Sequence, residues 1–326
     1  MPPADSILLK ALFWAGIQLY PVMKTADQSL HILVTGSGGQ LGREIHRLSA
    51  AGCPRDRFLF SDVRTLQGEE TLYLDITNPD AVSQVCASEG IDVIVNCAGY
   101  TDVERAESDA AAARQLNAGA PGTLAEVARK TGAFLIHIST DFVFDGKRSR
   151  PYTEVVPAAP LSVYGATKWE GEKAVLDSGL ERYLILRTAW MYSPYGKNFV
   201  KTMLALTRER ERLQVVSDQV GTPTAAADLA GFILDVIARR RFDVPGIYHY
   251  SDEGACSWYD FACAIRDLAG NTCEILPCRS EDYPAKAERP HYSVLDKTKV
   301  KKTFGITVPN WHDSLVACYQ RILEHD

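Results

Sequence analysis

The segment HILVTGSGGQLG, residues 31–42, joins a short apolar run to three glycines at a fixed spacing. The run over 31–35 has the continuous apolar character of a strand that is covered on both faces. Gly36, Gly39 and Gly42 form a G-x-x-G-x-x-G turn, and a helical pattern follows over 43–51. A strand, a glycine turn and a helix in this order predict the first unit of an α/β fold with a parallel sheet.

Strands and helices continue to alternate along the chain. Apolar runs over 58–62, 91–96, 133–138, 183–187 and 246–251 predict further strands. The intervening stretches predict helices, among them an Ala-rich one over 106–129 and one that starts at Asn78, a cap, followed by Pro79. This alternation is typical of a Rossmann-like, doubly wound parallel sheet with helices on both faces.

Charge and cysteine usage limit the classes of partner. The 326 residues contain 35 Lys and Arg against 41 Asp and Glu, a net charge of −6, without a long basic run. This argues against nucleic acid or a membrane surface as a partner. The 8 cysteines are spread thinly, which favours reduced thiols in a cytoplasmic protein over a disulfide framework, and no cluster predicts a metal site.

The glycine turn carries the first chemical signal. Such a turn lets backbone N–H groups approach a pyrophosphate at a helix N-terminus. Asp62 ends the second strand and lies twenty residues after Gly42, where it can accept from ribose hydroxyls. We therefore predict a nicotinamide dinucleotide bound by Gly36, Gly39, Gln40, Leu41, Gly42 and Asp62. Asp62 favours NADH, whereas Arg43 and Arg64 could neutralise the 2′-phosphate of NADPH, and the preference stays open.

The second signal is the pair Tyr164 and Lys168, which lie one helical turn apart on one face. A phenol near an ammonium can act as a proton donor, and we expect the charge of Lys168 to lower the pKa of Tyr164. Thr140 comes 24 residues before Tyr164, directly after a strand, at the sheet edge where ligands bind. These three residues form the predicted catalytic set.

The chain is predicted to have three parts. Residues 1–28 form a leader of uncertain role, either an accessory or mis-assigned segment before Met23 or an amphipathic helix packed on the body. Residues 29–190 form the NAD(P)-binding domain. Residues 191–326 are richer in Pro, Tyr and Trp and form mainly a smaller substrate-binding lobe, with about 223–252 returning to the sheet.

From residue 31 to the end, the sequence resembles the extended short-chain dehydrogenase/reductases, and within them the dTDP-4-dehydrorhamnose reductase family. The segments that carry the resemblance are G-S-G-G-Q-L-G (36–42), N-C-A-G-Y-T-D-V-E-R-A-E (96–107), S-T-D-F-V-F-D-G (139–146), V-Y-G-A-T-K-W-E-G-E (163–172), R-T-A-W-M-Y (187–192), N-F-V-K-T-M-L (198–204), D-Q-V-G-T-P-T (218–224) and R-P-H-Y-S-V-L-D (289–296). The resemblance implies reduction of the 4-keto group of a nucleotide-linked deoxysugar with NADPH or NADH, and it allows a homodimer.

The resemblance also implies roles for individual residues. Thr140, Tyr164 and Lys168 would be catalytic, and Tyr164 and Lys168 would also contact the cofactor. The other implied cofactor contacts are Asp75, Ile76, Asn96, Ala98 and Tyr100. The implied substrate contacts are Asp141, Phe142, Trp190 through a ring face, and Asn198, Lys201, Gln219 and Arg289 at the nucleotide diphosphate.

One position departs from the family, which usually has Tyr where this chain has Phe142. The missing hydroxyl permits activity, since one hydrogen bond contributes about 0.5–1.5 kcal/mol. Phe142 also cannot serve as the second carboxylate of a sugar-nucleotide dehydratase, which disfavours dehydration. Two alternatives stay open: a regulatory subunit that resembles methionine adenosyltransferase subunit beta, and a sugar-nucleotide epimerase with tightly bound NAD. The Glu170 and Glu172 side chains are expected to lie on a solvated helix face.

Overall fold

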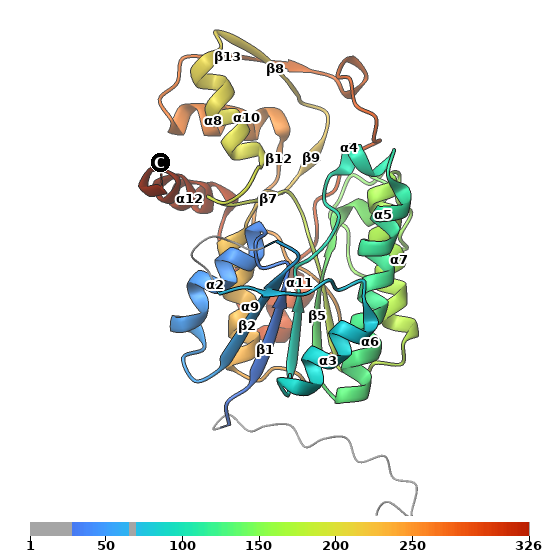
Figure 1. Cartoon of the computed structure of the whole chain (residues 1–326). Coiled ribbons are helices and arrows are strands. Elements are labelled where there is room, and N and C mark those ends of the chain that lie inside the picture. Colours follow the sequence, from blue (N-terminus) through green and yellow to red (C-terminus); the bar gives the residue numbers. More distant parts are fainter. Residues whose placement is uncertain (1–27, 65–69, 326) are drawn as a thin grey trace, which may run out of the picture.

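A sheet of seven parallel strands forms the centre of the computed structural model, which describes residues 28–64 and 70–325 (Figure 1). The order across the sheet is β11-β6-β5-β4-β1-β2-β3. The strands are β1 (His31–Thr35), β2 (Arg57–Asp62), β3 (Leu72–Tyr73), β4 (Val93–Asn96), β5 (Phe134–Thr140), β6 (Tyr183–Thr188) and β11 (Gly246–His249). The order reverses between β1 and β4, so a ligand site is expected at the carboxyl ends of these strands. The predicted doubly wound fold is confirmed.

Helices cover both faces of this sheet (Figure 1). α2 (Gln40–Gly52), α9 (Ala226–Ala238) and α11 (Thr298–Phe304) share one core with the side chains of Ile32 and Val34. α3 (Pro79–Ser88) and α6 (Ala120–Thr131) share the other core with Leu33, and α7 (Val163–Asp177) contributes to it. Successive residues of β1 thus point to opposite faces, as a strand requires. Asn78 caps α3 by accepting from the backbone N–H of Asp80 and Ala81, as predicted.

The single helix expected over 106–129 is wrong, because the structure divides this stretch. It contains α4 (Val103–Ala106), α5 (Ala110–Arg114), a π-helical turn η1 (Gln115–Gly119) and α6. Pro121 has no N–H for the carbonyl of Asn117, so a regular helical bond is lost there. α7 packs so closely on this turn that a Cβ at Gly171 would lie 2.0 Å from the Asn117 carbonyl oxygen.

The smaller lobe is built from three short two-stranded pairings and three helices. β7 (Met191–Tyr192) pairs with β10 (Thr224–Ala225), β8 (Arg212–Val216) with β13 (Glu274–Cys278), and β9 (Val220–Gly221) with β12 (Cys256–Ser257). The helices are α8 (Phe199–Glu209), α10 (Trp258–Leu268) and α12 (Trp311–His325). Short 3-10 turns occur at η2 (Asp141–Val143) and η3 (Ser280–Asp282). β11 and α11 belong to the sheet and its core and not to this lobe. The predicted limits of the NAD(P)-binding domain and the substrate-binding lobe stay a prediction. The predicted leader falls on residues 1–27, which lie outside the described residues, and on residue 28.

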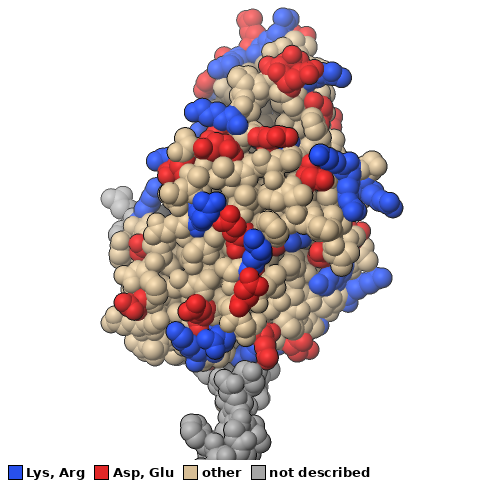
Figure 2. Space-filling model, turned by 90° about the vertical axis from the view of Figure 1, so that its right-hand side faces the viewer, with Lys and Arg blue, Asp and Glu red and all other residues tan. Residues whose placement is uncertain are grey.

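Basic and acidic side chains are interspersed on the face that Figure 2 shows, which lies toward α5 and α7 in Figure 1. Arg114 of α5 and Glu170 of α7 form one ion pair between these helices, at 2.7 Å. Such exposed pairs contribute little to stability. Among the helices of residues 28–64 and 70–325, none is both long and apolar enough to cross a membrane.

Candidate active site

Thr140 and Tyr164 meet at the carboxyl edge of the sheet. Thr140 is the last residue of β5, and Tyr164 lies in the first turn of α7, where the Thr140 side chain is close enough to lower the pKa of the phenol. Ser162 caps α7 by accepting from the Gly165 N–H at 3.1 Å. A Cβ at Gly165 would lie 2.2 Å from the Phe142 carbonyl oxygen. Glycine is therefore required here for the helix to approach the end of β5 and bring the phenol to Thr140.

Burial controls the acidity of Tyr164. Burial is the largest influence on the phenol, the Thr140 side chain acts against it and the charge of Asp141 adds to it, and together they raise the pKa of Tyr164 to about 12. The expectation that Lys168 lowers the pKa of Tyr164 is thus wrong for this structure, because desolvation of the phenolate dominates. The phenol is protonated at neutral pH and can act as a general acid.

Lys168 lies buried one turn further along α7. Its Nζ donates to the Ile138 carbonyl oxygen at 2.5 Å. A Cβ at Gly99 would lie 3.8 Å from the same Nζ, so the amine lies between the chain after β4 and the end of β5. Burial lowers the pKa of Lys168 to about 8, while the negative charge of Glu172 raises it. The ammonium form is therefore lost at mildly alkaline pH.

Asn117 is a site residue that the sequence did not predict. It is buried in the π-helical turn η1, and its Oδ1 accepts from the Tyr100 N–H at 2.8 Å. Its Nδ2 donates to the Tyr100 carbonyl oxygen at 3.1 Å and to the Thr167 hydroxyl at 3.2 Å. One amide thus fixes the loop after β4 against α7, beside Lys168. The polar residue within an Ala-rich stretch, four residues before Pro121, was the available signal.

Glu172 and Arg187 form a second supporting element that the sequence did not predict. Glu172 is 1% exposed and Arg187 is 4% exposed, with two contacts between them at 2.6 and 2.9 Å. The Ser139 hydroxyl also donates to Glu172. The expected solvated position of Glu172 is therefore wrong, because its side of α7 lies against β5 and β6. This bidentate pair links the helix that carries Lys168 to both strands.

The glycine turn has the geometry that a pyrophosphate needs. Gly36 adopts a left-handed backbone with φ of +65°, and Asp62 accepts from the Gly38 N–H at 3.0 Å. α2 begins after Gly39, with neither a side-chain cap nor an acidic residue in its first turn. Its first N–H groups are thus available to an anion. The residues of this turn fit a dinucleotide.

Other predicted cofactor residues have structural partners. The Asn96 Oδ1 accepts from the Thr35 hydroxyl at 2.8 Å, and its Nδ2 lies 3.0 Å from His137 Nδ1, so this amide links β4 to β1 and β5. A cofactor could reach only the backbone of Asn96 without breaking these contacts. The Asp75 carboxylate accepts from the Thr77 N–H, and the Ile76 side chain lies in the core. The backbone of Ala98 lies against Gly36. The Tyr100 hydroxyl donates to Asp109.

Asp141 and Phe142 lie next to the catalytic pair. Asp141 is buried, and burial raises its pKa to about 6 although Ser293 and Thr140 hydrogen-bond to it. Among the described residues its Oδ2 has no hydrogen-bond partner. The ring of Phe142 packs edge-on against Tyr164, with ring centroids 5.5 Å apart. A carboxylate oxygen and an aromatic edge thus flank the phenol.

Trp190 differs from its expected arrangement. Its indole is stacked on Trp258 with ring centroids 3.5 Å apart and an interplanar angle of 8°. A Cβ at Gly221 would lie 2.5 Å from the indole Cε2. The expected packing of a Trp190 ring face on the sugar is wrong in this arrangement, because protein groups occupy the ring.

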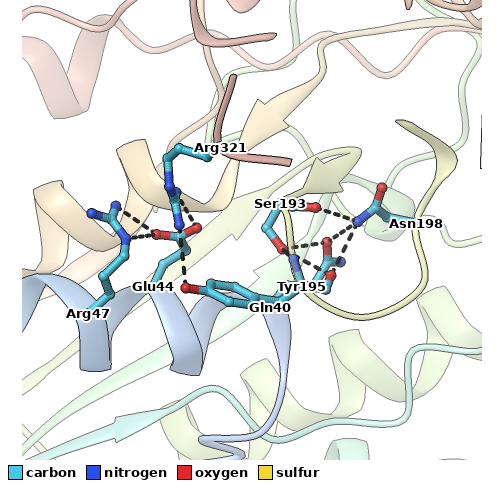
Figure 3. Close-up of polar contacts among 7 residues, drawn as sticks. All are labelled: Gln40, Glu44, Arg47, Ser193, Tyr195, Asn198 and Arg321. Carbon is cyan, nitrogen blue, oxygen red and sulfur yellow. Dashed lines mark hydrogen bonds and ion pairs between the residues drawn. The ribbon is translucent and has the colours of Figure 1, made fainter. Parts of the chain in front are cut away.

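The four residues expected at the diphosphate have separate partners. The Asn198 amide donates to Gln40 Oε1 at 2.9 Å and to the Ser193 carbonyl at 2.8 Å, which links the glycine turn to the start of α8 (Figure 3). Arg289 pairs with Glu104 at 2.5 Å. The remaining contacts are Lys201 Nζ to the Pro194 carbonyl and Gln219 Nε2 to the Ser280 hydroxyl. Asn198 and Lys201 thus both contact the segment 193–194, whereas Gln219 and Arg289 have partners in other segments.

A second link joins α2 to the smaller lobe (Figure 3). Glu44 of α2 is buried and contacts Arg321 of α12 at 2.6 Å and Arg47 at 2.8 Å. Arg321 also contacts the Tyr195 hydroxyl at 3.4 Å. The helix that starts at the glycine turn is therefore fixed to both α8 and α12.

Known proteins resemble this chain over most of its length. The family model described as the RmlD substrate binding domain matches residues 30–324. A dTDP-4-dehydrorhamnose reductase of Burkholderia thailandensis is 37% identical over 308 residues, which are 90% of this chain and 99% of that protein. A crystal structure of a dTDP-4-dehydrorhamnose reductase from Clostridium acetobutylicum superposes with a TM-score of 0.83 at 40% identity, covering 90% of this chain and 100% of that one. A dTDP-4-dehydrorhamnose reductase from Bacillus anthracis in complex with NADP has a TM-score of 0.82 at 34% identity, with 90% and 100% covered.

Proposed function

Since this chain belongs to the RmlD substrate binding domain family, we propose that it reduces dTDP-4-dehydro-L-rhamnose to dTDP-L-rhamnose with NADPH. The observation that carries the proposal is the placement of Tyr164 and buried Lys168 one turn apart on α7, next to Thr140 at the end of β5. Relatives that are named as this reductase, one of them solved with NADP, support the substrate and the cofactor.

The catalytic residues have distinct tasks in this reaction. NADPH supplies a hydride for C4 of the sugar when it is bound. Tyr164 donates its proton to the oxygen at C4, because burial keeps the phenol protonated well above neutral pH. Thr140 orients the same oxygen, and Lys168 binds the ribose hydroxyls beside the nicotinamide. Asn117 and the Glu172–Arg187 pair hold Lys168 and its helix in place.

The cofactor-binding residues lie in the glycine turn between β1 and α2 and around it. The N–H groups at the start of α2 bind the pyrophosphate, and Asp62 orders the turn through Gly38. Gln40 fixes the position of this turn relative to α8 through Asn198. We assign NADPH as the principal cofactor on the relative that is solved with NADP, and comparison with NADH tests this choice.

The substrate-binding residues are Asp141, Phe142 and Trp190 at the sugar. Arg289 is assigned to the diphosphate, for which its guanidinium has further N–H donors besides the one that contacts Glu104. Asn198, Lys201 and Gln219 keep the surrounding loops in place through their present contacts.

The homodimer and the cytoplasmic location also belong to the proposal. All eight cysteines are free thiols, which supports a reducing compartment.

The test is an NADPH-oxidation assay with dTDP-, UDP- and GDP-linked 4-ketosugars, followed by identification of the sugar product. We expect oxidation with the dTDP-linked 4-ketosugar and formation of dTDP-L-rhamnose. Oxidation with another nucleotide only would overturn the assigned base. No oxidation with any of them, together with recovery of a stoichiometric partner enzyme, would instead support a regulatory subunit.

A further inference from the structure

The backbone of Trp190 is in the left-handed region, with φ of +46°. Among the described residues, only Trp190 and Arg240 combine a positive φ with a side chain. A bulky aromatic residue is strained in this conformation, so its surroundings must hold it there. The location is close to the chemistry, because Thr188 pairs with Thr140 between β6 and β5, and Trp190 follows two residues later.

One face of the Trp190 indole is covered by Trp258. The two rings are nearly parallel, at 8°, and their centroids are 3.5 Å apart. Phe199 packs against Trp258, with ring centroids 4.6 Å apart. Trp258 is thus supported by the core of the smaller lobe and cannot retreat easily from Trp190.

The other face of the indole is covered by Gly221. A Cβ at this position would lie 2.5 Å from Cε2, 2.7 Å from Cζ2 and 2.8 Å from Nε1 of Trp190. The central atom is the nearest and its two ring neighbours are farther, so the approach is from above the ring plane. The space between the Trp190 and Trp258 rings, whose centroids are 3.5 Å apart, is too narrow for a Cβ of residue 221. Gly221 therefore lies on the face of the indole that is opposite to Trp258. The indole is enclosed between Trp258 and the backbone of Gly221.

Both enclosing groups come from one small ladder. β9 and β12 pair antiparallel, with Gly221 opposite Cys256 and Val220 opposite Ser257. Trp258 follows Ser257 directly and starts α10, where Ser257 and Asp260 form a capping box. The ladder fixes the spacing between Gly221 and Trp258, and the capping box fixes the direction in which the helix leaves it.

The edge of the indole remains available. The Trp190 Nε1–H donates no hydrogen bond to the part of the chain that the structure describes. It is also not among the fully buried, unpartnered polar atoms of that part, so the protein does not enclose it completely. An indole N–H is a donor only, and a sugar offers hydroxyl oxygens as acceptors.

We propose that Gly221 and Trp258 are positioning residues that clamp Trp190, so that its ring edge and indole N–H, and not a ring face, meet the substrate sugar. The contact with a substrate sugar rests on the proposed function. The clamp itself follows from the ring contacts, and it is testable in the free protein.

The first test combines two substitutions. Gly221→Ala places a methyl group against the indole, and we expect kcat/KM for the ketosugar to fall by about 100-fold, as for a displaced contact group. In a Trp190→Ala background the methyl group has space, so Gly221→Ala should lower kcat/KM for the ketosugar by less than about threefold. Gly231→Ala is the matched control, because nothing lies within 4 Å of a Cβ there. If Gly221→Ala lowered kcat/KM equally in the wild type and in the Trp190→Ala background, the proposed role of Gly221 in positioning Trp190 would be refuted.

The second test observes the indole directly in protein labelled with ¹⁵N-tryptophan, with Trp190→Phe used to assign its N–H resonance. We expect this resonance to carry a ring-current shift that disappears in Trp258→Leu and persists in Gly231→Ala. Addition of NADP⁺ and dTDP-L-rhamnose should move it as a hydrogen bond forms. Insensitivity to Trp258→Leu would refute the stacking, and an unchanged resonance in a demonstrably liganded protein would refute the edge contact. If the wild type reduces no ketosugar, the proposed function fails, whereas the Trp258→Leu comparison still tests the clamp.

Discussion

Alkaline pH should inactivate the enzyme by removing the proton of Lys168. Burial lowers the pKa of this side chain to about 8, whereas burial raises that of Tyr164 to about 12. The depressed lysine loses its charge as pH rises through about 8, while the phenol keeps its proton. Because the charged form of Lys168 is required, we expect kcat/KM for NADPH to fall about tenfold per pH unit above this value.

Two variants assign this titration to Lys168. Lys168→Arg keeps a permanent positive charge, so the alkaline decrease should disappear up to about pH 10, at a lower plateau. Glu172→Gln removes the negative charge that raises the pKa of Lys168, so the decrease should move to lower pH. The Glu172 variant also leaves Arg187 without its partner, and circular dichroism at each pH therefore checks that the protein stays folded.

The assay is the initial rate of NADPH consumption in overlapping buffers from about pH 6 to pH 10. A sample returned to neutral pH before measurement controls for irreversible loss. A flat profile for the wild type would refute the pKa of Lys168 that burial implies. An identical decrease in Lys168→Arg would show that another group is responsible.

Three further predictions concern single side chains. Tyr164→Phe should lower kcat by about 10²–10⁴-fold while leaving NADPH binding largely intact, and near-normal turnover would exclude the phenol as the acid. Phe142→Tyr should be neutral or raise kcat/KM by up to about tenfold, because a hydroxyl is added next to Tyr164, and a severe loss would indicate a differently shaped pocket. Burial raises the pKa of Asp252 to about 8, so its contribution to stability is present at acid pH and is lost as pH rises through that value. Asp252→Asn should therefore raise the melting temperature, by an increment that grows from about pH 5 to pH 8; an increment that does not change would contradict this.

Local sequence signals predicted the main elements. The glycine turn after β1 and the cap at Asn78 each depend on residues that are close in the chain. These motifs were sufficient to predict the fold class. They also placed Tyr164 and Thr140 at the carboxyl edge of one sheet, where β5 ends and α7 begins.

The remaining features depend on contacts between distant segments. Glu172 is buried because its side of α7 lies against two strands, and no periodicity of α7 alone indicates this. The bond between Gln40 and Asn198 joins residues 158 positions apart. The enclosure of Trp190 likewise requires the β9–β12 ladder, whose strands are only two residues long and have no pattern of their own.

The chain runs repeatedly between the sheet and the smaller lobe. After the sheet strand β6 it enters the lobe at β7, and it returns to pack on the sheet with α9 and β11. It enters the lobe again at β12, returns with α11 and ends in the lobe with α12. No single cut in the polypeptide separates the two bodies. A lobe of this kind cannot be exchanged between relatives as one gene cassette.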